Sequence, residues 1–298
     1  MWIQKVTGGI HSLTHAPDGN TLYVADGSGW VTAWELRTHV ARKLFRLTAT
    51  ERESTVRLLA SGDGQSLVTL GSGLRVWDSG SGVCRGEAPW EVNDALKCLD
   101  VARSRLLFAG TNRRTVWTWE FASCSSQLTD VRLPCGFLRG FALAPNHRVL
   151  VLIHTSETVS LFDPEMEVAS PLSDLRTLGG TVTGALFSPD GGTLIVFVGG
   201  SVATRKVLFD LPTQRIRVEV PGPLAYSWVF DIHPTAPVFV ALDQDSTLTL
   251  FNLETGRPLR SFNFTLGKQV RCVAFSPDGL TCAVGGSNKQ FAVFDVDL

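Results

Sequence analysis

The chain has 298 residues, a formal net charge of −1, 44% hydrophobic residues and 18% charged residues. This composition is typical of a folded globular protein, and the length fits one large domain or two ordinary ones. The balanced charge excludes the general attraction to nucleic acid or anionic membranes that a strong basic excess would give, although it leaves room for a local basic patch.

The chain starts without the basic and apolar regions of a signal peptide, and no apolar run approaches the roughly 18 residues of a membrane span. We therefore expect a cytoplasmic protein. The six cysteines lie without the paired spacing of a zinc site. We expect reduced, buried thiols, with a disulfide between Cys272 and Cys282 as the alternative, because these two cysteines are predicted to lie on neighbouring strands.

Two short markers repeat along the chain. The first is an aromatic residue followed by an acidic or amide residue at the end of a short apolar segment. In chain order these pairs are Trp34-Glu35, Trp77-Asp78, Trp119-Glu120, Phe162-Asp163, Phe209-Asp210, Phe251-Asn252 and Phe294-Asp295, at intervals of 42 to 47 residues. The second marker is a turn of the Ser-Pro-Asp-Gly type that precedes each pair. Its copies begin at Ala16, Ser61, Ala102, Ala144, Ser188, His233 and Ser276, and the copy at Ala102 has kept the spacing but lost the turn residues.

Each repeat predicts a set of short strands. In the turn, proline presets φ, aspartate bonds its own backbone and glycine takes the left-handed conformation. In the fifth repeat, for example, apolar segments at 185–187 and 193–198 flank such a turn. A third segment then ends in the aromatic residue, and a variable fourth one follows. Because apolar residues alternate with period two and turn residues recur often, we predict four strands and no helix in each repeat.

A four-stranded unit of about 43 residues cannot bury both of its faces alone, so the units must pack against one another. The last repeat ends after its third strand, whereas residues 1–6 form a spare strand before the first repeat. We expect this spare strand to complete the last unit. Residues 1–298 are therefore predicted to form a single all-β domain, a seven-bladed β-propeller of four-stranded antiparallel blades that is closed by the N-terminal strand.

The Ser-Pro-Asp-Gly turns and the Trp-Asp or Phe-Asp strand ends resemble those of WD-repeat proteins over essentially the whole chain. The resemblance implies a rigid propeller that binds peptide partners at the rim of its central channel. Two departures identify a divergent member: the Gly-His pair that usually opens each repeat is absent, and phenylalanine replaces tryptophan in the last four repeats. The buried hydrogen-bond network of the family is therefore not expected to form, and apolar packing between blades must take its place.

Sequence motifs for catalysis are absent. The chain has no nucleophile elbow, P-loop, HExxH, GxGxxG or EF-hand sequence. His11 and His15 are closely spaced, but on a strand they would lie about 13 Å apart and could not hold one ion. Asp100 and Asp231 are predicted to face the channel, where they either neutralise part of the charge at its mouth or form a carboxylate pair for acid–base chemistry. We expect no enzymatic activity, no metal and no cofactor.

A set of mostly cationic residues is predicted at the mouth of the channel. The positions six residues before the second residue of each turn, which is proline in five of the turns, fall just before the innermost strand of each blade. In chain order they are His11, Arg57 (with a one-residue gap), Lys97, Arg139, Thr183, Trp228 and Arg271, with Tyr226, Arg113 and Arg114 as neighbours. Such a rim favours an anionic ligand, for example an acidic or phosphorylated peptide. The alternative is that the arginine stems simply cover apolar surface while their charged ends stay in water.

These observations predict a protein–protein interaction scaffold that binds a protein or peptide partner and is itself monomeric, with no specific nucleic acid and no membrane as partner. An enzyme that uses the channel is one alternative, and a nucleic-acid binder that uses the cationic rim is another. A pI of about 6.6 disfavours the latter. Trp30 and Trp90 are either exposed interface anchors or packing residues between blades.

Overall fold

The structure is a computed structural model of residues 1–298. It describes residues 1–48, 57–70, 73–87, 96–101, 105–110, 115–120, 125–132, 138–145, 150–154, 159–163, 168–172, 174–175, 180–199, 204–222, 229–242, 247–264 and 270–298, and within 96–141 it describes the backbone alone.

The described residues form four-stranded antiparallel sheets. The strands from the first part of the chain pair in the orders β2 (Ile10–His15), β3 (Thr21–Asp26), β4 (Trp30–Glu35), β5 (Val40–Arg46); β6 (Arg57–Ala60), β7 (Ser66–Leu70), β8 (Leu74–Asp78), β9 (Cys84–Glu87); β10 (Leu96–Val101), β11 (Arg105–Gly110), β12 (Thr115–Glu120), β13 (Ser125–Arg132); and β14 (Leu138–Leu143), β15 (Leu150–His154), β16 (Val159–Asp163), β17 (Val168–Pro171). The later strands pair in the orders β18 (Thr181–Phe187), β19 (Thr193–Gly199), β20 (Arg205–Asp210), β21 (Arg215–Pro221); β22 (Phe230–Ile232), β23 (Val238–Leu242), β24 (Thr247–Asn252), β25 (Pro258–Asn263); and β1 (Trp2–Lys5), β28 (Gln290–Asp295), β27 (Thr281–Gly286), β26 (Val270–Phe275).

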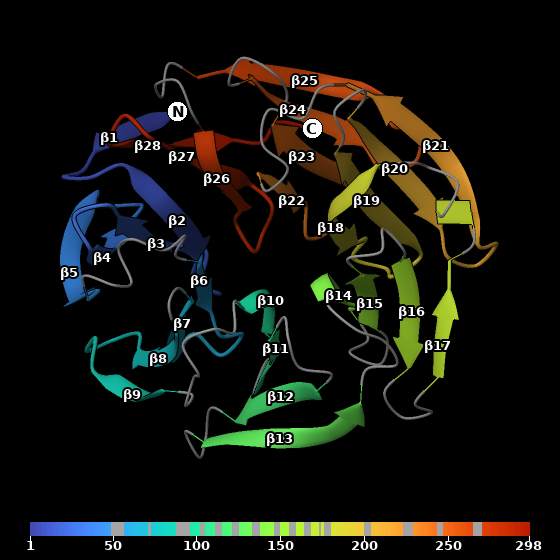
Figure 1. The fold of residues 1–298 in the computed structure, drawn as a ribbon. Coiled ribbons are helices and arrows are strands. Elements are labelled where there is room, and N and C mark those ends of the chain that lie inside the picture. The colour runs from blue at the N-terminus through green and yellow to red at the C-terminus, as the bar shows by residue number, and fades with distance from the viewer. Residues whose placement is uncertain are drawn as a thin grey trace.

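The sheets stand around a common centre, with the first strand of each repeat innermost (Figure 1). Inner strands of neighbouring sheets contact one another: β2 contacts β6 and β26, β14 contacts β10 and β18, and β22 contacts β26. Helical geometry among the described residues is limited to a short 3₁₀ turn at 174–175. The all-β architecture and the four-stranded units predicted from the sequence are confirmed.

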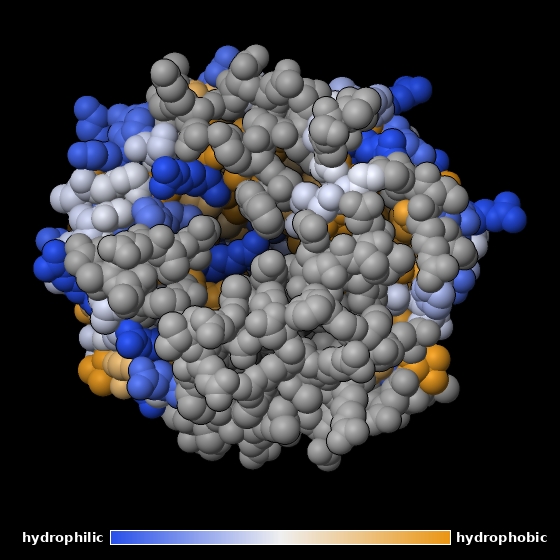
Figure 2. Space-filling view, viewed as in Figure 1, coloured by the Kyte–Doolittle hydropathy of each residue, from blue (hydrophilic) through white to orange (hydrophobic). Residues whose placement is uncertain are grey.

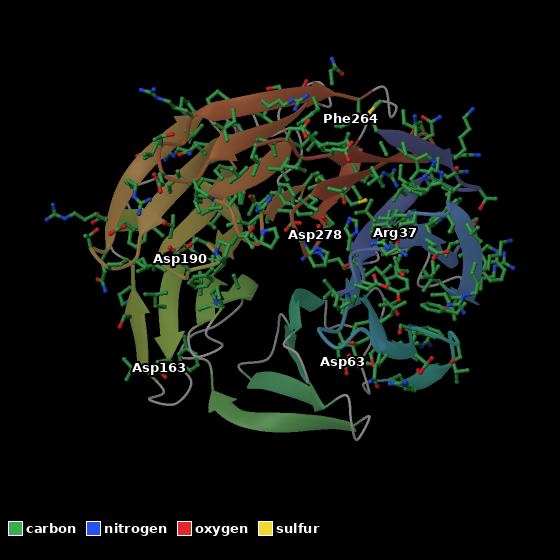
Figure 3. All side chains as sticks on the ribbon, turned by 180° about the vertical axis from the view of Figure 1, so that it is seen from behind. Arg37, Asp63, Asp163, Asp190, Phe264 and Asp278 are labelled. Atoms are coloured by element: carbon green, nitrogen blue, oxygen red, sulfur yellow. The ribbon has the colours of Figure 1, made fainter. Side chains whose placement is uncertain are left out.

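The Ser-Pro-Asp-Gly marker forms the same turn wherever the structure describes it. In the fifth repeat the Ser188 hydroxyl accepts the Thr193 N–H at 2.8 Å, and the Gly191 N–H donates to the Ser188 carbonyl at 2.8 Å. Gly191 has φ of 73°, the left-handed region that favours glycine. The same bonds recur in the second and seventh repeats. Three of the turn aspartates, Asp63, Asp190 and Asp278, lie around the centre of the molecule when it is seen from behind (Figure 3).

The sixth repeat has histidine where the second, fifth and seventh repeats have serine. The Nδ1 atom of His233 accepts the backbone N–H groups of Thr235 and Ala236, at 3.2 and 2.8 Å. This leaves the proton on Nε2, which donates to the Gly279 carbonyl of the neighbouring sheet at 3.0 Å. The substitution therefore turns a local cap into a link between two sheets.

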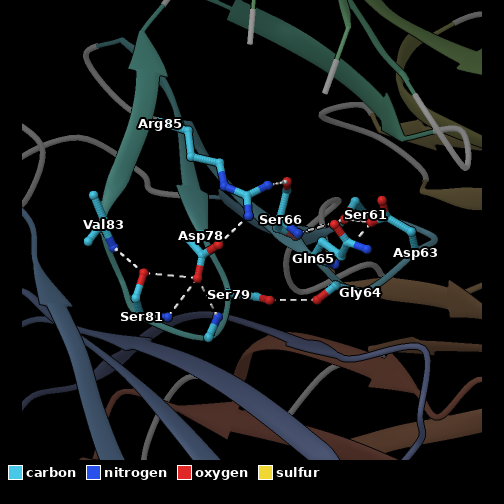
Figure 4. Close-up of polar contacts among 11 residues, drawn as sticks. Ser61, Asp63, Gly64, Gln65, Ser66, Asp78, Ser79, Ser81, Val83 and Arg85 are labelled. Carbon is cyan, nitrogen blue, oxygen red and sulfur yellow. Dashed lines mark hydrogen bonds and ion pairs between the residues drawn. The ribbon is translucent and has the colours of Figure 1, made fainter. Parts of the chain in front are cut away.

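The aromatic–acid marker also works through a turn. Asp78, which follows Trp77, accepts the backbone N–H groups of Gly80 and Ser81 at 3.1 and 2.7 Å and forms an ion pair with Arg85 (Figure 4). The hydrogen bonds from Ser81, followed by the contact with Arg85, lower the pKa of Asp78 to about 2. Asp210 caps the equivalent turn of the fifth repeat and pairs with Arg217. In these two repeats the acid of the pair thus fixes the connection to the outermost strand.

Apolar side chains fill the spaces between sheets. Phe45 of the first sheet stacks on Trp77 of the second with ring centres 3.9 Å apart, and Phe197 stacks on Phe230 at the same distance between the fifth and sixth sheets. Each such side chain stabilises the fold by about 1.5–3 kcal/mol on burial. This agrees with the prediction that apolar packing between units dominates.

The N-terminal strand belongs to the sheet of the last repeat. β1 pairs antiparallel with β28, with Trp2 opposite Val293, so the pairing predicted from the sequence is confirmed. The Trp2 ring lies 5.8 Å from that of Trp34 in the first sheet and 5.3 Å from that of Phe291 in β28. One aromatic side chain therefore joins the first and last repeats.

Part of the buried polar network that was expected to be lost is present. In the second sheet the Trp77 indole donates to the Thr69 hydroxyl at 2.8 Å, and both side chains are buried. In the first sheet the buried Trp34 indole N–H has no hydrogen-bond partner among the described residues. Val24 occupies the place of Thr69 there, because Trp34 pairs with Leu22 just as Trp77 pairs with Leu67. The second sheet therefore has one buried tryptophan–hydroxyl bond that was not expected from the sequence.

Cys272 and Cys282 lie on paired strands but are not opposite each other. Cys272 pairs with Gly285 and Cys282 with Phe275, so the two cysteines are offset along the strands. Both are free thiols, as is Cys84. Burial raises the pKa of Cys272 to about 12, which keeps this thiol protonated and unreactive.

Candidate functional site

The predicted rim residues occupy one recurring position, the extra residue of a β-bulge. In β2, Ile10 pairs with Asp26 and Ser12 with Ala25, so His11 has no partner. The pairing of the innermost strand skips one residue in the same way in four other sheets. The skipped residues are Lys97, Arg139, Thr183 and Arg271.

A bulge bends its strand and changes the direction of the unpaired side chain. In each of these five strands, one side chain therefore points differently from its neighbours. The sequence predicts these residues just before the inner strands, whereas the structure places them within those strands. Arg57 differs, because it is the first residue of β6 and pairs with Leu70 without a bulge.

Three predicted residues come together from neighbouring inner strands. His11, Arg57 and Arg271 lie on β2, β6 and β26, and β2 contacts both other strands. Arg57 and Arg271 are exposed, and His11 is half-buried. Burial, followed by the positive charge of Arg271, lowers the pKa of His11 below its usual value. At neutral pH this cluster therefore carries its positive charge on the two arginines.

A carboxylate beside the cluster was missed by the sequence analysis. Asp26 lies near enough to His11 to raise its pKa, against the effect of Arg271. Its oxygens accept the Thr7 hydroxyl and the Ser28 N–H, both at 2.9 Å. The signal available in the sequence was the Asp-Gly-Ser-Gly turn at 26–29, which caps itself in this way. The rim thus contains an anchored negative charge.

Several predicted residues cannot be placed. Tyr226, Trp228, Arg113, Arg114 and Trp90 lie outside the described residues. For Lys97 and Arg139 only the backbone is described. Figure 2 shows a hollow near the middle of the face in view, and described hydrophilic residues lie beside it.

Asp231 links two inner strands. One of its carboxylate oxygens accepts the Phe275 N–H of β26 at 2.7 Å, and the other accepts the Ile232 N–H at 2.9 Å. Burial raises the pKa of Asp231 to about 6. The backbone groups occupy both oxygens, which favours a structural role. Asp100, the proposed partner, lies on β10, and its side chain is not among those described.

A groove of about 470 Å³ lies between the first and last sheets on the opposite face. Its lining includes Asp18, Arg37, His39, Asp278 and Leu280, and Arg37 and Asp278 are labelled in Figure 3. The Asp18 and Asp278 carboxylates both accept backbone N–H groups within their own turns. The groove therefore offers few free polar groups to a ligand.

Trp30 is half-buried at the start of β4, with Lys43 and Arg46 over its indole ring. It is therefore neither a freely exposed anchor nor a fully buried packing residue.

Among the described residues, no group of three or more His, Cys, Asp or Glu side chains is arranged to hold a metal ion. Likewise, no helix in the described part of the chain is long and apolar enough to cross a membrane. No family model matches the sequence. The site is therefore interpreted from its own geometry: exposed cations on neighbouring inner strands can bind an anionic group.

Proposed function

We propose that this chain is a divergent WD-repeat protein whose sheets are the seven blades of a closed β-propeller. The proposal is supported by the two turn markers, which repeat through the chain, and by the hydrogen bonds that the serine turns of the second, fifth and seventh repeats share. The pairing of β1 with β28 supports closure, because it joins the first repeat to the last. A rigid scaffold of this kind presents its connecting segments to partners.

We further propose that the protein is a non-catalytic interaction scaffold that binds an acidic or phosphorylated peptide at the channel mouth. The observation that carries this proposal is the recurrence of the bulge, which leaves one residue unpaired in five inner strands, and three of these residues are Lys97, Arg139 and Arg271. Fixed cations beside apolar walls attract anions more strongly than cations on an open surface, since the local dielectric is lower.

The test uses binding of defined peptides. A fluorescent decapeptide with four phosphoserines, a second with four glutamates, and a third with glutamines in their place are titrated by fluorescence anisotropy. The variant carries Arg57→Ala, Arg139→Ala and Arg271→Ala. A matched control carries three alanine substitutions on the outside of the protein, at Arg215, Arg257 and Arg260.

We expect binding of either anionic peptide to weaken about 30-fold or more in the rim variant, because three charge-assisted contacts are lost. The control should bind like the unmodified protein, and the glutamine peptide should not bind. If the rim variant binds both anionic peptides unchanged, the rim is not the site. Thermal melting of each variant checks that the fold is intact.

A further inference from the structure

The outer edge of the first sheet carries a second cluster of cations. Trp30, at the start of β4, is directly opposite Arg46 of β5, and Thr32 is opposite Lys43. The Lys43 ammonium lies 4.7 Å from the centre of the Trp30 ring, and the Arg46 guanidinium carbon lies 5.9 Å from it. Both cations are exposed. Trp30, Lys43 and Arg46 are called the Trp30 surface below.

A β-bulge creates this surface. Residues three apart on a regular strand point to opposite faces, so Lys43 and Arg46 would normally be separated by the sheet. The register of β5 shifts between Phe45 and Lys43, which leaves Leu44 as the extra residue. The shift brings both cations to the face that carries Trp30, where the indole holds them side by side. Arg42 points elsewhere and donates to the Gly80 carbonyl of the second sheet.

The charge of this surface is not neutralised by the protein. In the described part of the chain, neither Lys43 nor Arg46 forms an ion pair with an acidic residue. Arginines on the other outer strands do: Arg85 pairs with Asp78, Arg217 with Asp210 and Arg260 with Asp297. β5 therefore differs from those strands in having two adjacent cations that are free to meet a ligand.

β5 is also an open sheet edge. It pairs with β4 on one side and is the last strand of its sheet, and among the described residues no strand pairs with its other side. Its first residue, Val40, is 60% exposed. Hydrophilic side chains lie along the margin of the molecule where β5 runs (Figures 1 and 2). Charged side chains on an edge strand discourage pairing with another copy of the same strand, because like charges would meet. They favour a strand of opposite charge.

We propose that an acidic peptide in extended conformation binds here, pairing with β5 as a fifth strand while its carboxylates meet Lys43 and Arg46. The backbone of the edge supplies hydrogen bonds, as in other cases of strand addition. Alternate residues of a strand share one face, so a peptide with an acid at every second position places its charges over the Trp30 surface. This site lies at the outside of the first sheet and is independent of the rim.

The experiment uses three labelled peptides of equal length. The first alternates glutamate with valine (Gly-Glu-Val-Glu-Val-Glu-Gly), the second has glutamine for glutamate, and the third has proline for valine. Proline keeps the charge but removes the N–H groups needed for strand pairing. Binding to the full chain is measured by fluorescence anisotropy with three proteins: the unmodified chain, a Lys43→Glu/Arg46→Glu variant, and a control with Arg215→Glu on the outer strand β21.

We expect the glutamate–valine peptide to bind the unmodified chain and the control equally, and the Lys43→Glu/Arg46→Glu variant about tenfold more weakly or worse. The glutamine and proline peptides should each bind at least about fivefold more weakly than the first. Equal binding of the valine and proline peptides would overturn strand pairing, and equal binding to all three proteins would overturn the site.

Two further probes separate a peptide site from a general anion site. Single-stranded deca-thymidylate and phosphatidylserine vesicles are titrated against the same proteins. If either depends on Lys43 and Arg46 and binds more tightly than the acidic peptide, the surface recognises phosphate and the proposal is wrong. Replacing Arg57 and Arg271 with alanine should leave peptide binding at β5 unchanged, so failure at one site is distinguished from failure at the other.

Discussion

The hydrogen bond between Trp77 and Thr69 provides a direct measure of the polar contacts inside these sheets. Thr69→Val keeps the size and branching of the side chain but removes the acceptor, which leaves the Trp77 indole N–H buried without a partner. An unsatisfied buried donor costs about 1–3 kcal/mol. For a domain of this size we expect a fall in Tm of roughly 2–6 °C, measured by circular dichroism. Thr69→Ser keeps the hydroxyl and should therefore lower the Tm by less.

The first sheet allows the reverse experiment. Trp34 has an unpartnered indole N–H in the described part of the chain, and Val24 belongs to the same buried apolar cluster. Val24→Thr would place a hydroxyl where Thr69 stands in the second sheet. We expect this substitution to stabilise the protein by about 1 kcal/mol, because the new hydroxyl and the indole satisfy each other.

A double-mutant cycle tests the reasoning. In a Trp77→Phe background the donor is absent, so Thr69→Val should cost less than about 0.5 kcal/mol. If Thr69→Val costs the same in both backgrounds, its effect comes from packing and the hydrogen-bond argument fails. If Val24→Thr destabilises the protein, the equivalence of the two sheets is refuted.

Three further changes probe buried groups and turns. Burial lowers the pKa of His15 to about 4, so the unfolded chain takes up a proton before the folded protein does, and the free energy of unfolding falls as the pH drops from 6.5 to 4. His15→Phe should remove up to about 3 kcal/mol of this fall, measured by urea titration at each pH. The pKa of Asp231 is raised to about 6, so its ionisation increasingly destabilises the folded protein as the pH rises from 3.8 to 6. Asp231→Asn points an NH2 group at one of the two bound backbone N–H groups, so the variant should be less stable than the unmodified protein at pH 4 and should gain up to about 3 kcal/mol relative to it by pH 7. Gly279→Ala should cost about 3 kcal/mol or more, because a Cβ would lie 2.2 Å from the His233 ring. Gly191→Ala has a similar positive φ, but its Cβ would meet only Pro145, at an ordinary contact distance of 3.7 Å, so it should cost only about 1 kcal/mol in the same melting experiment.

The repeated units were predictable because their turns are specified locally. Ser188 and Asp190 bond to backbone groups within five residues, so the same four letters produce the same turn in any repeat. The pairing of residues 1–6 with the last repeat was also predictable, since one strand was spare and one sheet was incomplete. These inferences needed only spacing and turn chemistry.

The side-chain arrangement of the site was less accessible. A bulge depends on the register between two strands, and the residues around His11 and Arg271 contain no pattern that predicts it. The same holds for Trp30, where the shift at Leu44 decides that Lys43 and Arg46 share a face. The Trp77–Thr69 bond was missed because the loss of the Gly-His pairs was taken to remove the whole network, whereas two of its members can bond alone.

The union of β1 with β28 also bears on how the chain acquires its structure during synthesis. Trp2 pairs with Val293, so β1 is synthesised long before the strand with which it pairs. Until β28 has been made, the Trp2 side chain lacks its contact with Phe291, and the first sheet lacks a neighbour on one side. The seam between the first and last repeats therefore closes only after the other sheets have been synthesised, which leaves an aromatic strand unpaired for much of synthesis.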